Sequence, residues 1–532
     1  MPEKRSSPLC HPAAVFAGLF LVSLAFQIQS GAWRSDFGGH ADEAAHVVTS
    51  LMVRDYLAGG FLEDPHPLRF AEGYYERFPR VALGHYPPGF YLVVAPALLL
   101  FRTGATLLVL MNFFSAGAGL LLFVFGRRLL RRESGAVMIA FLYVALPQTR
   151  TYTAIVMADL LLVVFSLLAA LSFLRFLQEG RSRDSLFFGC WAAAAILTKG
   201  SGMGLALLPP LALLFSGKGR LLLAPRLWLA TLPVLLFAFP WMLLTAGITG
   251  EGMQEIGFTE WIRSALPFYG GAIVREAGYT GFAAFSGAAL FGLHRGVVRK
   301  QPAGHGEAVL WALLMGGLGV ALVVPAGLDH RYLMPVIPSL LLLGAGAVQA
   351  LSPAVPGKWQ QVLVAAFALA VLGETARSVQ KFYTGASEAV RLAVGEDHAD
   401  GVAGEPVRLL VVSNATGEGA VIAAAALEIR TAGLQVARGS KILSTSDWMG
   451  RGYRLAFETE KEFFAILRNG KIGYLIIDDV LSDAPGHWSA TRDRLDTPGD
   501  GRLTRIGSVP SWRRTARRAF DVYRFRDESP LP

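Results

Sequence analysis

The sequence predicts a mainly α-helical, polytopic membrane protein with about 11 transmembrane helices, followed by a C-terminal soluble α/β domain. Three observations predict this class. The chain of 532 residues is 53% hydrophobic and 17% charged, whereas soluble domains average about 25% charged residues. The long apolar runs are confined to residues 12–376, and residues 377–532 have the composition of a soluble protein. The Lys and Arg residues of the apolar part lie in short connections between the runs.

Two rules place and orient the membrane spans. A helix needs about 20 apolar residues to cross the hydrocarbon core, and positive residues collect in short cytoplasmic loops. The N-terminus is then cytoplasmic and the C-terminal domain extracytoplasmic (periplasmic), in the plasma (inner) membrane. The net charge of +9 reflects this orientation, and no basic nucleic-acid-binding domain is visible. The predicted spans are 12–31, 105–126, 134–150, 157–178, 185–198, 202–216, 227–246, 278–294, 307–325, 332–350 and 360–376.

The apolar segment 88–101 is predicted to be a juxtamembrane or re-entrant helix at the end of the first outer loop, 32–87. It is bounded by two prolines and Arg102, and it is short for a membrane span. If it were counted as a span, a cluster of four arginines would move to the outer side, against the positive-inside rule. These arginines are Arg127, Arg128, Arg131 and Arg132.

The sequence divides into a membrane domain at 1–376, a linker at 377–404 and an extracytoplasmic α/β domain at 405–532. In the last part, strand patterns at 407–412 and 472–477 alternate with helix patterns at 417–432 and 458–468, which is typical of a small α/β layer fold. A Gly-x-Gly follows its first strand, but Ile422 stands where a dinucleotide-binding fingerprint needs a third glycine. We therefore expect an acceptor-binding or scaffold role for this domain.

Ionisable and aromatic side chains gather on the predicted outer side of the membrane domain. Such groups are costly at a membrane boundary, and they usually face a cavity or one another. Carboxylates can accept a proton from an attacking hydroxyl or amine, and Arg or Lys can bind a phosphate. The candidate residues are Asp42, Glu43, His46, His85, Tyr86, Asp159, Lys199, His330, Arg331 and Tyr332.

Each candidate also has a purely structural alternative. Asp42 and Glu43 could begin a surface helix, where acidic residues favour the positive end of the helix dipole. Asp159 could cap its helix, Lys199 could extend to the membrane interface, and Tyr86 could belong to an interfacial aromatic belt. The alternative for His330 and Arg331 is the start of a helix in the headgroup layer.

A divalent metal site is a further hypothesis for the same face. Its ligands would be His46 and His85, joined by His40, Asp42 or Glu43. Glu43 and His46 are three residues apart and would share a helix face. Oxygen and imidazole ligands suit Zn or Mn, and Mg is a third candidate.

The order of these motifs resembles the GT-C membrane glycosyltransferases, in particular their protein O-mannosyltransferase and aminoarabinose-transferase (glycosyltransferase family 39-like) branch. An Asp-Glu pair stands in the first outer loop, and Pro87-Pro88 precedes an aromatic-rich helix. An Asp follows at the head of a later span, then a Thr-Lys-Gly turn, and then Arg-Tyr-Leu-x-Pro-x-x-Pro. The resemblance covers residues 12–350.

The resemblance implies a polyprenyl-phosphate sugar donor and a lipid, glycan or protein acceptor at an extracytoplasmic active site. It implies that Asp42 is the catalytic base with Glu43 beside it, and that Asp159 is a second acidic residue of the site. Arg331 and Lys199 would neutralise the donor phosphate, with Tyr86 beside them. The substrate-binding candidates are His85, His330 and Tyr332.

The sequence departs from the aminoarabinose transferases at one point. They carry Glu-Lys before the Pro-Pro, whereas this chain has His85 and Tyr86. A His at this point is compatible with the mannosyltransferases. The missing Lys leaves Lys199 and Arg331 as the predicted phosphate contacts.

Two other classes of function compete with a transferase. A transporter or lipid flippase often shows related halves and helices interrupted near the midplane, but here the ionisable groups cluster at one interface. A non-catalytic membrane assembly subunit would keep the fold with a degenerate site. Movement of label off a polyprenyl-phosphate sugar separates an enzyme from both.

Overall fold

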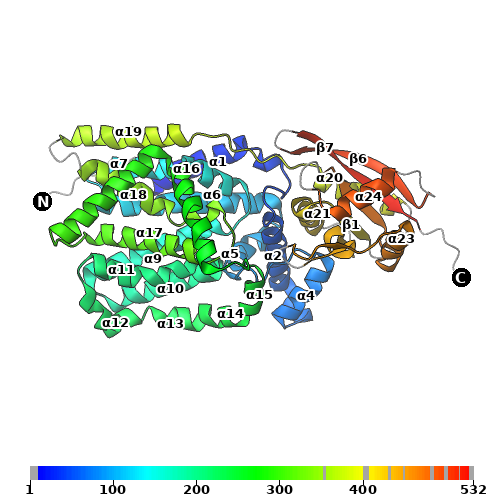
Figure 1. Ribbon diagram of the computed structural model, residues 1–532, viewed down its shortest axis with the longest axis horizontal. Coiled ribbons are helices and arrows are strands. Elements are labelled where there is room, and N and C mark those ends of the chain that lie inside the picture. Colours follow the sequence, from blue (N-terminus) through cyan, green and yellow to red (C-terminus); the bar gives the residue numbers. More distant parts are fainter. Residues whose placement is uncertain are drawn as a thin grey trace.

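A helical bundle and a sheet-containing domain lie end to end in the computed structural model, as Figure 1 shows. The structure describes residues 10–350, 355–399, 407–428, 433–446, 450–479, 484–496, 501–513 and 516–526. The predicted fold class, a mainly helical membrane protein with a C-terminal α/β domain, is confirmed. The main bundle helices are α1 (Pro12–Gln29), α6 (Gly104–Leu129), α7 (Glu133–Ala145), α9 (Asp159–Glu179), α10 (Ser182–Thr198), α11 (Leu208–Phe215), α16 (Phe258–Leu293), α17 (His305–Val323), α18 (Ile337–Ala350) and α19 (Gly357–Thr375).

Fewer helices than predicted are long enough to cross a membrane unbroken. Within the described ranges, five helical stretches meet that standard of length and apolar composition. Helix α7, for example, has only 13 residues and ends before Pro147, where the short α8 (Pro147–Ala154) begins. Thirteen residues rise about 20 Å, less than the hydrocarbon thickness of about 30 Å. The number of 11 spans therefore stays a prediction. The five stretches are Pro12–Gln29, Gly104–Leu129, Asp159–Glu179, Pro225–Leu244 and His305–Val323.

The segment predicted as a juxtamembrane helix forms α5 (Gly89–Leu100), and both its ends lie on the side of the sheet domain. At its start, a Cβ on Gly89 would lie 2.7 Å from the carbonyl oxygen of Leu197, at the end of α10. Just after its end, Arg102 donates hydrogen bonds to the carbonyls of Ala426 (2.8 Å) and Leu427 (3.2 Å) in the sheet domain. The helix therefore starts and finishes at the same end of the bundle.

The region between the predicted spans 227–246 and 278–294 is largely helical and is not a simple connection. Helix α16 begins at Phe258 and continues to Leu293, with a break at Gly278, whose φ is 70°. Trp261 and Tyr269 in its first half are buried against the end of α17. This half has few apolar residues, so a search for long apolar runs does not predict a helix there. The preceding predicted span, 227–246, is a chain of short pieces: α12 (Pro225–Trp228), α13 (Thr231–Pro233), η6 (Val234–Ala238) and α14 (Phe239–Leu244), followed by α15 (Ala246–Glu251).

The C-terminal domain is built on a five-stranded sheet with the order β2-β1-β5-β7-β6. Strand β1 is parallel to β2 and to the central strand β5, and β7 is antiparallel to β5 and β6. The strands are β1 (Arg408–Val412), β2 (Gln435–Arg438), β5 (Tyr474–Asp478), β6 (Leu503–Arg513) and β7 (Ala516–Phe525). Helices α21 (Ala415–Leu427) and α23 (Glu460–Asn469) match predicted helices, while β2, β6, β7 and α24 (Gly486–Asp496) were not predicted.

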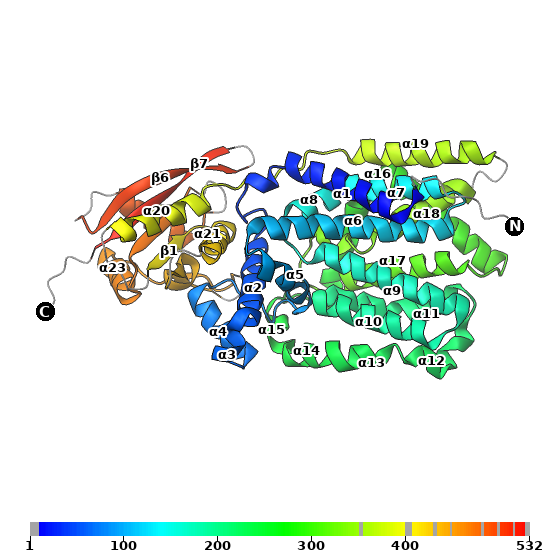
Figure 2. The same cartoon turned by 180° about the vertical axis from the view of Figure 1, so that it is seen from behind.

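The region predicted as a linker, 377–404, contains α20 (Ala386–Ala399). Ala389, Val390 and Ala393 on this helix are buried, and they belong to the same apolar core as residues of α21. Figure 2 shows α20 beside α21 over the sheet. The domain therefore begins before residue 405, and only residues 400–404 of the linker fall outside the described part.

Helix α2 (Glu43–Asp55) lies across the bundle end and joins the two parts, as Figure 1 shows. It packs against α21, where a Cβ on Gly419 would lie 2.9 Å from the Cβ of Ala44. Arg80 donates a hydrogen bond to the carbonyl of Ala415, and Arg77 Nε donates one to that of Leu434 at 2.8 Å. The sheet domain is thus held directly against the segment that carries Asp42.

A larger residue at Gly419 should loosen this junction. In the variant Gly419→Val the side chain meets α2, and overpacking of this kind costs about 1–3 kcal/mol of stability. We expect a lower melting temperature in detergent and faster proteolytic separation of the sheet domain. Gly395→Val on α20 is the matched control, because a Cβ there meets nothing within 4 Å. Equal melting temperatures for the two variants would contradict the close packing of α21 on α2.

Candidate active site

A cavity of 340 Å³ opens between the bundle and α2, on the side of the sheet domain. It is lined by Asp42 at the start of α2, by His85 and Tyr86 before α5, and by Lys199 after α10. Its opposite wall is formed by α16, the end of α17 and the turn η8 (His330–Leu333), which supply Tyr269, Val320, Ala321, Arg331 and Tyr332. The structure thus brings six of the predicted site residues to one cavity.

Asp42 forms the polar centre of the cavity wall. Its Oδ2 accepts a hydrogen bond from Arg331 Nη1 at 2.7 Å and another from the Tyr86 hydroxyl at 2.9 Å. Burial would raise the pKa of Asp42, but the charges and hydrogen bond supplied by Arg331 and His40 outweigh it and hold that pKa well below its ordinary value. The carboxylate is consequently charged at neutral pH. Asp42 precedes α2 but makes no side-chain cap, so the helix-start alternative does not describe its contacts.

Arg331 is held from two sides. Its Nη1 meets Asp42, and its Nε lies 3.3 Å from Asp329 Oδ2. Asp329 also accepts from the Arg331 backbone N–H, which fixes the turn, and His40 Nε2 lies 3.8 Å from Asp329 Oδ2. An arginine between two carboxylates is pre-positioned, and its remaining N–H groups can meet an anion in the cavity.

Asp159 and Lys199 form a buried ion pair beside this centre. Lys199 Nζ lies 2.6 Å from Asp159 Oδ1 and 5.0 Å from the ring centroid of Tyr332. Asp159 begins α9, but the N-cap position is Ala158 and carries no side-chain cap, so capping does not account for the carboxylate. Lys199 is 5% exposed and lines the cavity, so it does not extend to the membrane interface. Its ammonium adds a second positive group to the cavity wall.

Glu43 points away from the cavity, although it is adjacent to Asp42. It is fully buried, and its Oε1 lies 2.6 Å from Lys381 Nζ and accepts from the Val156 N–H at 3.0 Å. Its Oε2 accepts from the Gly39 N–H at 2.7 Å. Through these contacts the carboxylate joins the first loop, the segment between α8 and α9, and the segment after α19. The structure therefore gives Glu43 a structural role, whereas the sequence predicted that it belongs to the catalytic site.

Neutralising Glu43 should cost stability. Glu43→Gln leaves the Lys381 ammonium buried without a counter-charge, and breaking a buried ion pair in this way costs about 3–5 kcal/mol. We expect a large drop in melting temperature in detergent. The double variant Glu43→Gln/Lys381→Met also removes the unpaired ammonium of Lys381. It should therefore recover much of the lost stability. A single variant as stable as the wild type would contradict the contacts described for Glu43.

The proposed metal ligands lie at the same end of the bundle. His46 Nδ1 is 3.1 Å from the Tyr91 hydroxyl, and the His46 ring lies 4.5 Å from that of Tyr86. Burial lowers the pKa of His46 to about 4, so the imidazole is neutral at pH 7. His85 lines the cavity. Among the described residues, no group of three or more His, Cys, Asp or Glu side chains could hold a metal ion. Metal binding stays a prediction.

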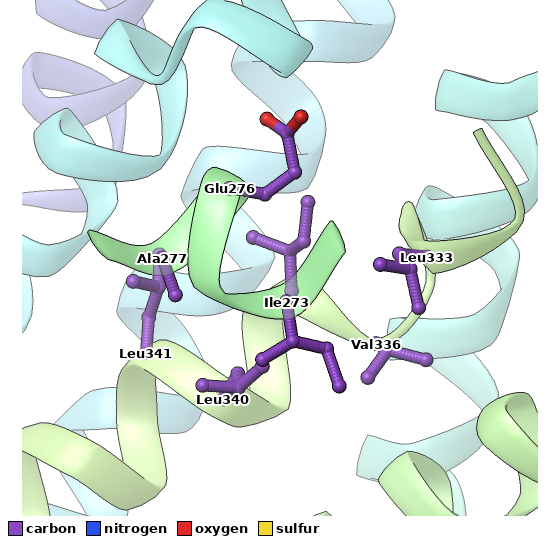
Figure 3. Close-up of a pocket in the computed structure, with 8 residues that line it drawn as sticks. Ile273, Glu276, Ala277, Leu333, Val336, Leu340 and Leu341 are labelled. Atoms are coloured by element: carbon purple, nitrogen blue, oxygen red, sulfur yellow. The ribbon is translucent and has the colours of Figure 1, made fainter. Parts of the chain in front are cut away.

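The other two substrate-binding candidates, Tyr332 and His330, lie in different places. Tyr332 lines the cavity, and its hydroxyl donates to the carbonyl of Ala326 at 3.3 Å. The His330 side chain turns to Glu276 instead, with 3.4 Å between Nδ1 and Oε1. Figure 3 shows a small apolar pocket below Glu276, whose carboxylate points away from Leu340 and Leu341. The structure therefore does not place His330 among the residues that line the main cavity.

Sequence reasoning missed three residues that shape the site. Lys381, the partner of Glu43, lies in a region read as a linker, and Tyr269 lies in a region read as a loop. Asp329 stands two residues before Arg331, and this Asp-x-Arg spacing was the one available signal for its role. The other two carry no local signal, because their partners are far away in the sequence.

The fold and the cavity define a polytopic membrane protein with a charged cavity at the end of its bundle next to the sheet domain. A family model described as "Dolichyl-phosphate-mannose-protein mannosyltransferase" matches residues 85–243. No curated protein matches the chain.

Three solved structures share the fold at low sequence identity. The structure of ArnT from Cupriavidus metallidurans in the apo state has a TM-score of 0.56 and 16% identity, covering 96% of this chain and 98% of that chain. The same protein bound to undecaprenyl phosphate gives a TM-score of 0.50 and 14% identity, over 96% and 97%. The oligosaccharyltransferase AglB from Archaeoglobus fulgidus, in complex with an inhibitory peptide and a dolichol-phosphate, gives 0.53 and 14%, over 88% and 69%. The chain thus shares the fold of these three structures.

Proposed function

We propose that this protein is a membrane glycosyltransferase that moves a sugar from a polyprenyl-phosphate donor to a lipid, glycan or protein acceptor. The observation that carries the proposal is the cavity wall that combines one charged carboxylate with two cationic groups. Asp42, Arg331 and Lys199 all line this cavity, within a GT-C fold. Two similar structures were solved with undecaprenyl phosphate or dolichol-phosphate bound, which supports a polyprenyl-phosphate donor for this chain.

The proposed reaction is a single displacement. An acceptor hydroxyl or amine attacks the anomeric carbon, the bond from that carbon to the phosphate oxygen breaks, and its electron pair leaves with the phosphate. Asp42 takes the proton of the acceptor, while Arg331 and Lys199 stabilise the charge that develops on the departing phosphate. Inversion at the anomeric carbon follows from attack opposite the leaving group.

The ion pair of Asp42 and Arg331 sets a condition on this mechanism. A carboxylate with a strongly lowered pKa is a weak base, and a base works best when its pKa is near the working pH. A donor phosphate that binds Arg331 adds a third negative group beside the positive charge that stabilises the Asp42 carboxylate. The pKa of Asp42 then rises, and the carboxylate becomes a better base only when the donor is in place.

The same ion pair predicts the pH dependence. Asp42 must be ionised to accept a proton, and its lowered pKa keeps it ionised below the ordinary Asp value of about 3.9. We expect kcat/KM to be flat from about pH 7 down to about pH 5. An acid limb between pH 6 and 7 that persists in Asp42→Glu would assign the titration to another group.

The proposed orientation puts the cavity and the sheet domain outside the cytoplasm, in the plasma (inner) membrane. The chain reverses at the far end through turns with positive residues at or beside η5 (Gly219–Leu223) and η7 (His294–Val298), namely Lys218, Arg220, Arg295, Arg299 and Lys300. Positive residues in short loops favour the cytoplasmic side. Labelling of single cysteines introduced at Arg34 and at Arg299 in intact cells tests this: the first should react with an impermeant reagent and the second should not.

A transfer assay tests the function itself. Purified protein is incubated with a polyprenyl-phosphate sugar labelled in the sugar and with an envelope extract. The expected result is label in an acceptor fraction together with free polyprenyl phosphate. Movement of intact donor between leaflets of a proteoliposome, with no label leaving the lipid, would favour a flippase instead.

A further inference from the structure

A second groove, of 610 Å³, lies at the same end of the bundle but shares no lining residue with the cavity. It is formed where three elements end or turn: α1, the junction of α7 and α8, and the segment after α19. Figure 2 shows these elements together at the edge of the bundle, near its junction with the sheet domain. In the proposed orientation, this end of the bundle is the boundary between the membrane and water.

The lining of the groove changes from apolar to cationic. Phe26, Ala145 and Leu372 come from the ends of membrane helices, and Arg150 and Arg377 come from the segments that follow. An anionic lipid has apolar acyl chains joined to a negatively charged phosphate. The apolar half of the groove complements the acyl chains, and the basic half complements the phosphate.

Arg150 is the residue best placed to hold an anion. Its guanidinium lies 4.4 Å from the ring centroid of Phe26, which fixes the side chain by a cation–π contact. Its Nε is buried and has no hydrogen-bond partner among the described residues. No carboxylate of the described part lies within ion-pair distance of it. A half-buried arginine with unused donors is costly at a membrane boundary unless an anion meets it.

Arg377 connects this groove to the active-site side of the bundle. Its Nη2 lies 2.6 Å from Glu276 Oε2, and Glu276 in turn meets His330. Gln148 on α8 donates a hydrogen bond to the carbonyl of His330 at 2.5 Å. The groove and the turn that carries Arg331 are therefore braced by the same residues.

We propose that this groove binds the phosphate headgroup of a membrane lipid, with Arg150 donating to the phosphate oxygens and the apolar half covering the start of an acyl chain. The ligand class is a phosphate-bearing glycerolipid of the leaflet next to the sheet domain. This inference does not depend on the proposed glycosyl transfer, because it uses none of the residues that line the cavity.

Native mass spectrometry of the purified protein tests the proposal. The probes are phosphatidylglycerol, diacylglycerol with the same acyl chains, and inorganic phosphate. We expect phosphatidylglycerol to bind, diacylglycerol not to bind, and millimolar inorganic phosphate not to displace the lipid. Arg150→Gln should weaken phosphatidylglycerol binding about tenfold, the usual scale for one lost hydrogen bond to a charged group. Arg34→Gln, an exposed arginine outside the groove, is the matched control and should bind as the wild type does.

A second variant keeps the test decisive if Arg150→Gln does not fold. Ala376 is exposed and lines the groove, so Ala376→Trp fills the space without removing a buried contact. It should exclude phosphatidylglycerol while the melting temperature stays near that of the wild type. Wild-type affinity in both variants, or equal binding of diacylglycerol, would overturn the proposal. Displacement of the lipid by inorganic phosphate would show a site for the free anion instead.

Discussion

Replacing Asp42 with Asn is expected to lower kcat for sugar transfer about a thousandfold, because the loss of a positioned general base costs about 10²–10⁴ in rate. Asn keeps the size of the side chain and can still accept a hydrogen bond from Tyr86. It cannot take a proton from the acceptor. The measurement is the initial rate of label transfer at saturating donor, with expression and melting temperature as checks on folding.

The Asp42 variant also separates two roles that the geometry allows. If Asp42 is the base, kcat falls and the apparent KM for the donor changes little. If Asp42 only positions Arg331, the donor KM rises while kcat is largely kept. Asp64→Asn is the matched control, because Asp64 lies in the same outer loop but pairs with Arg69 away from the cavity. A kcat within a factor of two of the wild type would remove Asp42 from the chemistry.

Arg331→Gln is expected to lower kcat/KM about 10²–10³-fold, the range seen when a donor to a developing oxyanion is removed. Arg331 meets Asp42 at 2.7 Å and Asp329 at 3.3 Å, so its loss also leaves two carboxylates without their shared cation. The pKa of Asp42 should then rise, and the acid limb of kcat/KM should move to higher pH. Arg331→Lys keeps the charge but not the planar fork, so it should recover only part of the activity.

The matched control for this variant is Arg34→Gln, which removes an exposed arginine from the same end of the bundle. It should leave kcat/KM unchanged. If Arg331→Gln lost activity without any shift of the acid limb, Asp42 would not be coupled to Arg331 in the working enzyme. If its activity matched the control, the donor phosphate would have to bind elsewhere.

The sequence grouped the candidate residues at one end of the bundle because apolar runs and positive loops together determine which turns share a side. Asp42, Lys199 and Arg331 could be grouped this way although they are far apart in the chain, and the structure places all three on one cavity. Asp159 joins them through its ion pair with Lys199.

What the sequence could not supply is the direction in which each side chain points. Asp42 and Glu43 are adjacent, but successive residues at a helix start point about 100° apart. Asp42 therefore meets the cavity, while Glu43 meets Lys381, 338 positions further on. The local sequence around Glu43 does not predict a partner so far away in the chain.

The missed fold elements have a related cause. The first half of α16 and the whole of α20 pack against protein, so neither shows the continuous apolar run of a membrane span. Both were read as connections. The ends of β6 and β7 carry several charged residues, which likewise concealed a long hairpin at the edge of the sheet.

The most direct measurement is a cryo-electron microscopy map of the Asp42→Asn protein with a polyprenyl-phosphate sugar, since a slow variant retains its donor. The account predicts density for the phosphate within hydrogen-bond distance of Arg331 and Lys199, with the anomeric carbon facing residue 42. Donor phosphate seen instead in the groove beside Phe26 and Arg150, with the cavity filled only by water, would contradict it.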